Sequence, residues 1–198
     1  MIQNEPNMRH RRETEIKLLA RDRKQVRKRL SQLAFKVFKA RHFESNYLFD
    51  FPDLRLHKSG CLLRLRFAGG ESLLTFKGPP LRTRRYGSRR EIETRVEDGA
   101  LLREVLKNLE LKPVFVYEKY RTTYATGNRA DIYGLPLVAY DETPIGNYLE
   151  LEGPEKWIDK IATQLGYSPQ DYITSTYPAL YVRKCREERR KPANMVFM

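Results

Sequence analysis

Charged and apolar residues alternate along many short stretches of this chain. Residues 13–19, for example, read ETEIKLL, and residues 148–152 read YLELE. Alternation with a period of two is typical of a β-strand that buries one face. The stretches with this pattern, including a shorter one at 46–51, are residues 13–19, 46–51, 62–67, 72–77, 89–96, 114–124, 137–143 and 148–152. Gly69 and Gly70 separate two of these stretches and predict a hairpin turn.

Three other stretches, over residues 21–33, 98–109 and 154–165, carry apolar residues at helical spacing. Pro154 opens the third of them and Gly166 follows it, as is common at the two ends of a helix. About eight strands with three helices between them are an α+β arrangement. The strands carry too many charges for a doubly wound parallel sheet, whose strands are almost continuously apolar.

The predicted strands have one apolar face and one charged face, because residues two apart point to the same side of a sheet. Ile16 and Leu65 are typical of the apolar face. The charged face holds Glu13, Glu15, Lys17, Arg64, Arg66, Lys77, Glu91, Glu93, Lys119, Arg121, Asp141, Glu150 and Glu152. For a single strand, a solvent-facing surface with cross-strand ion pairs explains this pattern. Repeated over most of the strands, it favours a barrel closed with its charged face inward.

A barrel interior with this many charges needs partners for them. It is stable only if acids pair with bases or if a highly charged ligand lies among them. Paired carboxylates suit Mg²⁺ or Mn²⁺, which prefer oxygen ligands. Arginine and lysine side chains suit phosphate oxygens. The charged face therefore favours a complex of a divalent metal with a polyphosphate as the ligand.

Six short motifs along the chain resemble, in the same order, those of one known family. Residues 13–17 (ETEIK) look like the ExExK motif of the CYTH family, whose members are also called triphosphate tunnel metalloenzymes. The other five are LRLR at 63–66, TFKGP at 75–79, REIE at 90–93, KYR at 119–121 and GNYLELE at 146–152. ExExK alone is a weak signal, but six motifs in order over about 140 residues are a strong one.

The resemblance implies an α+β fold, a closed or nearly closed antiparallel β-barrel of about eight strands that forms a charged tunnel, with helices packed outside. It also implies an enzyme that acts on triphosphates with Mg²⁺ or Mn²⁺. Glu15 and Lys77 would be catalytic. The implied metal ligands are Glu13, Glu15, Glu150 and Glu152. The implied phosphate-binding residues are Lys17, Arg64, Arg66, Lys77, Lys119 and Arg121. A second metal site or a purely supporting role, with both alternatives open, is implied for Glu91, Glu93 and Asp141.

Members of the family include class IV adenylyl cyclases and inorganic or thiamine triphosphatases. The triphosphatases use a tyrosine two residues before an aspartate in the second strand, paired with a lysine, to activate water. Aligned on Asp50, this position is Leu48 here, and Tyr47 faces the other way unless a bulge intervenes. The missing hydroxyl favours a cyclase that converts ATP into cyclic AMP and pyrophosphate. A triphosphatase is the first alternative, and a non-catalytic protein that binds triphosphate or polyphosphate is the second.

The composition limits size and partners. The chain has 198 residues, 40% of them hydrophobic, and a net charge of +13. This length suits one domain, expected over residues 13–182, between basic tails at 1–12 and 183–198. The positive charge favours an anionic partner, here a nucleoside or inorganic triphosphate. The basic clusters at 21–29 and 82–90 come without a nucleic-acid-binding motif, so we expect no specific nucleic-acid partner.

The remaining signals concern location and reactive side chains. No apolar run exceeds four residues and no signal peptide opens the chain, so we expect no membrane segment. Cys61 and Cys185 lie far apart and in no metal-binding spacing, which favours a reduced, cytoplasmic protein. We expect His10, His42 and His57 on the surface or in loops. The sequence leaves open whether the chain forms a homodimer.

Overall fold

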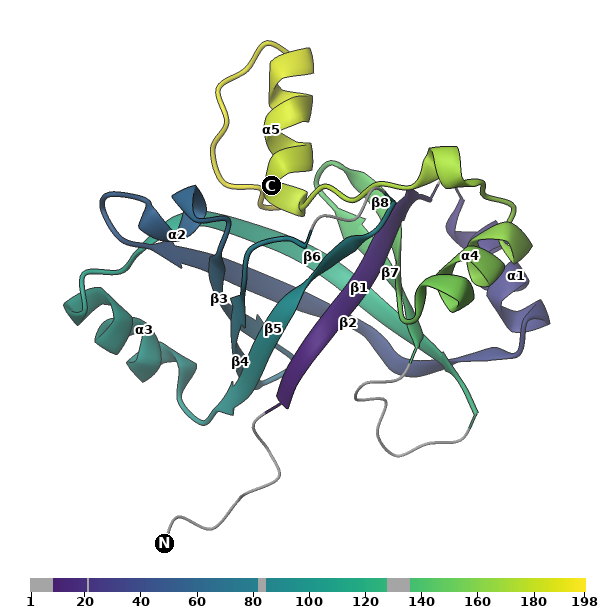
Figure 1. Cartoon of the computed structure of the whole chain (residues 1–198), viewed down its shortest axis with the longest axis horizontal. Coiled ribbons are helices and arrows are strands. Elements are labelled where there is room, and N and C mark those ends of the chain that lie inside the picture. The colour runs from purple at the N-terminus through teal and green to yellow at the C-terminus, as the bar shows by residue number, and fades with distance from the viewer. Residues whose placement is uncertain (1–8, 21, 82–84, 128–135) are drawn as a thin grey trace, which may run out of the picture.

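The computed structural model describes residues 9–20, 22–81, 85–127 and 136–198, and within these ranges eight strands close into one antiparallel barrel (Figure 1). Around the barrel the strand order is β1-β5-β4-β3-β2-β6-β7-β8, so the first and last strands in the chain are neighbours. This confirms the predicted α+β barrel. The strands are β1 Arg9–Leu19, β2 Phe35–Asp50, β3 Leu62–Ala68, β4 Glu71–Lys77, β5 Gly87–Val96, β6 Lys112–Thr126, β7 Leu137–Thr143 and β8 Gly146–Glu152.

Strand β2 is much longer than its predicted segment, residues 46–51. It pairs with β6 from Phe35 to Asp50, with register shifts on both sides of Lys39 and another between Leu48 and Phe49. Each shift changes which residues share a face of the sheet. The period-two pattern is therefore broken in the first part of β2, and the prediction was wrong about where the strand begins.

The turn between β3 and β4 is the predicted glycine hairpin. Gly69 and Gly70 have φ angles of 59° and 83°. A two-residue type I′ turn needs this left-handed conformation at both central positions, and residues with a Cβ rarely adopt it. Ala68 and Glu71 pair directly on either side of the turn.

The helices lie outside the barrel, and three of them are the predicted ones. They are α1 Arg23–Gln32, α3 Gly99–Asn108 and α4 Glu155–Gln164. Asp22 and Asp98 cap α1 and α3 by accepting backbone N–H groups, and Pro154 is the N-cap of α4 rather than its first helical residue. The pattern carries no signal for α2 Arg55–Lys58. The near-helical spacing of Tyr172, Tyr177 and Tyr181 favours the packing of a C-terminal helix, which the structure has as α5 Tyr177–Glu187. None of the helices in the described ranges is long and apolar enough to cross a membrane.

Apolar clusters fill the space between the strands and the helices. The largest joins the outward side chains of β1 and β8 to α1 and α4, and its fully buried members include Ile16, Leu18, Leu149, Leu151 and Ile158. Burial of one such side chain contributes about 1.5–3 kcal/mol to stability. Smaller clusters include Leu106 of α3 and Leu180 of α5. Because the apolar faces of these strands point outward, their charged faces point into the barrel.

The carboxyl-terminal segment packs against the barrel. Helix α5 stands over one end of it (Figure 1), and beyond this helix Met195 is fully buried. The backbone of Met195 donates to Val116 O and accepts from Glu118 N on β6, both at 2.9 Å. Residues 183–198, predicted as a basic tail, thus contain a buried anchor. At the other end of the chain, β1 begins at Arg9, inside the predicted tail 1–12.

Replacing Met195 tests this anchor. Met195→Ala should lower the free energy of unfolding by about 2–5 kcal/mol, because it leaves a cavity where a buried side chain was. Met198→Ala is the matched control, since Met198 is exposed. Both variants would be measured by denaturant unfolding. Equal stability of the two variants would contradict the packing of the C-terminal segment.

Candidate functional site

The inward side chains of the barrel line a cavity of about 300 Å³. Every site residue predicted from the sequence lies on its wall, except Asp141, which is fully buried behind it. The residues on the wall come from separate strands: Glu13, Glu15 and Lys17 from β1, Arg64 and Arg66 from β3, Lys77 from β4, Glu91 and Glu93 from β5, Lys119 and Arg121 from β6, and Glu150 and Glu152 from β8. Barrel closure therefore brings together residues that are up to 139 positions apart in the sequence.

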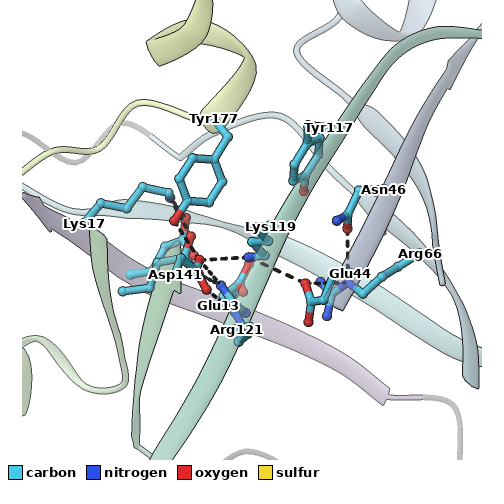
Figure 2. Close-up of polar contacts among 12 residues, drawn as sticks. Glu13, Lys17, Glu44, Asn46, Arg66, Tyr117, Lys119, Arg121, Asp141 and Tyr177 are labelled. Carbon is cyan, nitrogen blue, oxygen red and sulfur yellow. Dashed lines mark hydrogen bonds and ion pairs between the residues drawn. The ribbon is translucent and has the colours of Figure 1, made fainter. Parts of the chain in front are cut away.

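Asp141 on β7 anchors two of the basic residues. It accepts from Lys119 Nζ at 2.8 Å and from Arg121 Nε and Nη2, both at 2.6 Å. The two Arg121 bonds form a fork, the strongest arrangement between a guanidinium and a carboxylate. Tyr177 Oη on α5 donates to the same carboxylate at 2.6 Å (Figure 2). Both oxygens of Asp141 are occupied in this structure, where it holds Lys119, Arg121 and Tyr177 in place.

Lys17 lies between two carboxylates. Its Nζ is 2.7 Å from Glu15 Oε1 and 3.4 Å from Glu150 Oε1, and Glu150 also contacts Arg121. Burial disfavours the charged ammonium, but Glu15 and Glu150 more than offset this and raise the pKa of Lys17 above its ordinary value. Lys17 therefore stays positively charged inside the barrel.

On the opposite part of the wall, Arg64 connects β3 to β4 and β5. Its Nη2 donates to Thr75 Oγ1 at 3.1 Å, and Thr75 donates to Glu93 Oε2 at 2.8 Å. Arg64 Nη2 also lies 3.8 Å from Glu91 and 3.6 Å from Glu93. These neutral and charged partners hold the Arg64 guanidinium in one orientation.

Glu13 and Glu91 form a close carboxylate pair beside Lys77. Lys77 Nζ is 2.5 Å from Glu13 Oε2 and 3.4 Å from Glu91 Oε2. Burial, together with the hydrogen bond and the charge of Glu13, raises the pKa of Glu91 to about 8. Glu13 is also buried, but Lys77 and the hydrogen bond with Glu91 hold its pKa well below the usual range. One proton is therefore shared by this pair at neutral pH.

The predicted metal ligands fit a divalent cation in part. Glu15 and Glu152 face each other directly across β1 and β8, and both line the cavity. Like charges at directly opposed positions repel each other, and a cation between them would relieve this. Carboxylate oxygens are also the ligands that Mg²⁺ and Mn²⁺ prefer. In the described part of the chain, however, no three acidic, histidine or cysteine side chains are grouped as a metal site. Glu13, Glu15 and Glu150 are held instead by Lys77, Lys17 and Arg121, respectively.

Two further cavity residues, Glu44 and His42, were not predicted to lie there. Both line the cavity from β2, although His42 was predicted to lie on the surface or in a loop. Glu44 is 2% exposed and lies 3.8 Å from Arg66 Nε and 3.7 Å from Lys119 Nζ. Despite burial, the positive charges of Arg66 and Lys119 lower the pKa of Glu44 well below its ordinary value. The signal for both residues is the period-two run of His42, Glu44 and Asn46.

Tyr177 was predicted only as a packing residue of a C-terminal helix, but it also lines the cavity. Lys17 Nζ lies 5.3 Å and Lys119 Nζ 5.1 Å from the centre of its ring. Cations over an aromatic face are attracted by the ring. Since its hydroxyl also binds Asp141, Tyr177 joins α5 to the charged interior (Figure 2).

The residues near Leu48 occupy the places that the alternation predicts. Leu48 lines the cavity, whereas the ring of Tyr47 packs outside against Phe67 at 5.7 Å. Asp50 accepts backbone N–H groups of Leu56 and His57, at 3.0 and 2.9 Å, and so holds the α2 turn. Strand β2 therefore supplies no tyrosine hydroxyl to this part of the cavity.

A closed antiparallel barrel whose interior is filled with paired acids and bases defines a class of tunnel proteins. The CYTH domain model matches residues 11–177. The chain therefore belongs to the CYTH family, as the six motifs indicated.

Individual relatives agree with this assignment. The chain is 28% identical over 169 residues to "Putative adenylate cyclase MJ0240" of Methanocaldococcus jannaschii, an alignment that covers 83% of this chain and 95% of the relative. Its fold is similar to that of a "putative adenylate cyclase" from Vibrio parahaemolyticus, with a TM-score of 0.75, 18% identity and coverage of 87% and 98%. It also resembles "putative adenylyl cyclase HpAC1" from Hippeastrum, described as having a dominant triphosphatase activity, with a TM-score of 0.56, 18% identity and coverage of 91% and 97%.

The proton shared by Glu13 and Glu91 gives a prediction for the metal-free protein. Between about pH 5 and 8 the native state keeps a proton on Glu91 that the unfolded chain has lost, so wild-type stability should fall as the pH rises through this range. Glu91→Gln has no proton to lose. We expect the fall between pH 5.5 and 8.5 to shrink by more than about 1 kcal/mol in this variant.

The measurement is denaturant unfolding in EDTA at several pH values. Glu104→Gln, on the exposed surface of α3, is the control and should follow the wild-type curve. If Glu91→Gln also follows the wild-type curve, Glu91 is ionised in the native state and the assignment of a shared proton to Glu13 and Glu91 is wrong.

Proposed function

We propose that this protein binds a triphosphate together with a divalent metal inside its barrel and converts ATP into cyclic AMP and pyrophosphate. The observation that carries the proposal is the group of cations on the cavity wall, which includes Lys17, Arg64, Arg66, Lys77, Lys119 and Arg121. So many positive charges in one small cavity match a ligand with several negative charges. A triphosphate has such charges along its whole length.

The charge state of these residues supports the same ligand. Neighbouring carboxylates raise the pKa of Lys17 and of Lys77 above the ordinary value, in spite of burial. Arginine is always charged, and its planar fork suits two oxygens of one phosphate group. Phosphate oxygens would therefore meet donors that are already charged and held in place, which limits the reorganisation needed on binding.

The carboxylates supply the other half of the proposed site. Glu15 and Glu152 would hold Mg²⁺ or Mn²⁺, with Glu13 and Glu150 as further ligands once a phosphate has taken over their cationic partners. A divalent metal neutralises charge on phosphate oxygens and makes the phosphorus easier to attack. The Glu13–Glu91 pair, with one pKa near 8, can hold or release a proton close to neutral pH.

Leu48 favours a cyclase over a hydrolase. It gives the wall next to Arg64 an apolar side chain where a hydroxyl would help to orient water. The ribose 3′-hydroxyl of ATP needs no such help, because it is tethered close to its own α-phosphate. Its attack would form the O3′–P bond, break the bond to pyrophosphate and release the hydroxyl proton to solvent. The Arg and Lys side chains would stabilise the charge of the leaving pyrophosphate. The adenylate cyclase names of the relatives support this direction.

An organic or inorganic triphosphatase is the second candidate. Two observations favour it: the triphosphatase activity described for HpAC1, and Lys77, the lysine that the family's hydrolases pair with their tyrosine. Here water would attack a terminal phosphate and the same cations would hold the leaving group. A protein that only binds triphosphate or polyphosphate is the third candidate, since binding residues alone do not make a catalyst.

The products distinguish the three candidates. The protein would be incubated with ATP and Mn²⁺, and in parallel with inorganic triphosphate and thiamine triphosphate, and the products separated by chromatography. We expect cyclic AMP and pyrophosphate from ATP. ADP or phosphate alone, with faster turnover of inorganic triphosphate, would replace the cyclase by a triphosphatase. Binding without any product would leave only the third candidate.

Glu15 tests the role of the metal. Glu15→Gln keeps the shape of the side chain but removes its charge, so we expect activity to fall by about a hundredfold or more and the Mn²⁺ concentration for half-maximal activity to rise. Glu104→Gln, far from the cavity wall, is the matched control and should retain full activity. Unchanged activity of Glu15→Gln would refute its assignment as a metal ligand.

A further inference from the structure

Three buried hydrogen-bond donors have no acceptor; two lie on the β3 and β6 part of the cavity wall, and the third lies directly behind it on β2. Among the described residues, Asn46 Nδ2 and Arg64 Nε have no hydrogen-bond partner. The third donor is Tyr117, whose hydroxyl oxygen accepts from Arg64 Nη1 at 3.5 Å and whose own proton has no acceptor in the same part of the chain. Side chains this deeply buried normally satisfy their donors, so unpaired ones need an explanation.

The three side chains belong to one patch. Asn46 on β2 is fully buried and lies opposite Arg66 on β3 and opposite Tyr117 on β6. Tyr117 and Arg64 are 6% and 7% exposed, and both line the cavity. In Figure 2 the amide of Asn46 and the hydroxyl of Tyr117 lie on the same side of Lys119 and Glu44.

The direction of the Asn46 amide is fixed by its neighbour. Arg66 Nε donates to Asn46 Oδ1 at 3.2 Å. A guanidinium can only donate, so the oxygen of the amide must face Arg66 and the NH₂ group must point elsewhere. The NH₂ group of Asn46 is thus left without a partner because the amide oxygen must face Arg66. Its orientation is not arbitrary.

The chemistry of the patch selects an acceptor with negative charge. Donors without acceptors destabilise a fold, and a ligand that supplies the acceptors removes this penalty on binding. Burial alone would raise the pKa of Tyr117, but Arg64, Lys119 and Arg66 lower it below its ordinary value. A more acidic phenol donates stronger hydrogen bonds, especially to an anionic oxygen.

We propose that the Asn46 amide, the Tyr117 hydroxyl and Arg64 Nε form a subsite for one phosphoryl group of the triphosphate, on the wall opposite the carboxylates of β1 and β8. The inference rests on the proposed function, because it takes the ligand to be a triphosphate. It assigns substrate binding to two residues outside the family motifs, Asn46 and Tyr117. The phosphoryl group in this subsite would accept from two neutral donors, Asn46 and Tyr117, and from the Arg64 guanidinium, while the metal-bound part of the ligand would lie near Glu15 and Glu152.

The test measures binding separately from turnover. Inorganic triphosphate would be titrated into the full chain by calorimetry in EDTA, where a metal-dependent reaction cannot proceed. Tyr117→Phe keeps the ring and removes the hydroxyl donor. Asn46→Leu removes the amide; Arg66 then loses Asn46 as an acceptor but keeps Glu44 as a charged partner. We expect each change to weaken binding on the order of tenfold. Tyr140→Phe is the control, since it removes a buried hydroxyl outside the cavity and should bind like wild type.

The outcomes separate this inference from the proposed function. Failure of the wild-type protein to bind triphosphate both in EDTA and with Mg²⁺ or Mn²⁺ would overturn both. Binding by wild type and equal binding by folded Tyr117→Phe and Asn46→Leu would overturn only the subsite. Turnover assays with Mn²⁺ complete the test: a rise in KM at nearly constant kcat is expected for Tyr117→Phe. A large fall in kcat with an unchanged dissociation constant would assign Tyr117 to the reaction step and overturn the subsite.

Discussion

The structure depends on one electrostatic constraint: a barrel with a charged interior must neutralise each charge locally. An isolated ion in such a cavity is costly, and removing one member of a buried pair typically costs about 3–5 kcal/mol. Here the neutralisation is distributed. Lys17 is shared by Glu15 and Glu150, Asp141 holds Lys119 and Arg121, and the Glu13–Glu91 pair retains a proton beside Lys77. A binding site made in this way is preorganised by its own ion pairs, and a ligand enters it by exchanging partners.

The same constraint explains why helices are needed outside. A strand with one charged and one apolar face cannot leave the apolar face in water, so α1 and α4 cover β1 and β8 through Ile16, Leu149 and Ile158. The arrangement is thus the reverse of an ordinary protein core, because an apolar layer surrounds a polar centre. The pairing of β1 with β8 closes the barrel wall. Glu15 and Glu152 face each other across this pair, so these two carboxylates come from the first and the last strand of the barrel.

Regular alternation made much of this predictable. Each inward residue from Glu13 to Glu152 in the motifs could be placed on a face by its period of two, and closure followed from the charge on that face. The pattern failed where the backbone is irregular. Register shifts around Lys39 conceal the first part of β2. Glu44 lies beyond these shifts, in the regular run of His42, Glu44 and Asn46, and it was missed because the predicted strand began only at Asn46. Tyr177 was missed as a cavity residue for another reason. The spacing of residues along a helix does not indicate which strand the helix packs against, so the contact of Tyr177 with Asp141 could not be predicted from it.

The anchoring of the C-terminal segment has a practical consequence. Strand β6 carries Lys119 and Arg121 on its inner side, while on its outer edge the backbone of Met195 is bonded to Val116 and Glu118. Phe197 N also donates to Glu118 Oε2 at 3.0 Å. The last residues of the chain are therefore a structural part of the tunnel wall. A truncation that removes Met195 and Phe197 takes away part of the scaffold of the binding site, whereas the outward-facing surface of α3 offers a place for a label away from it.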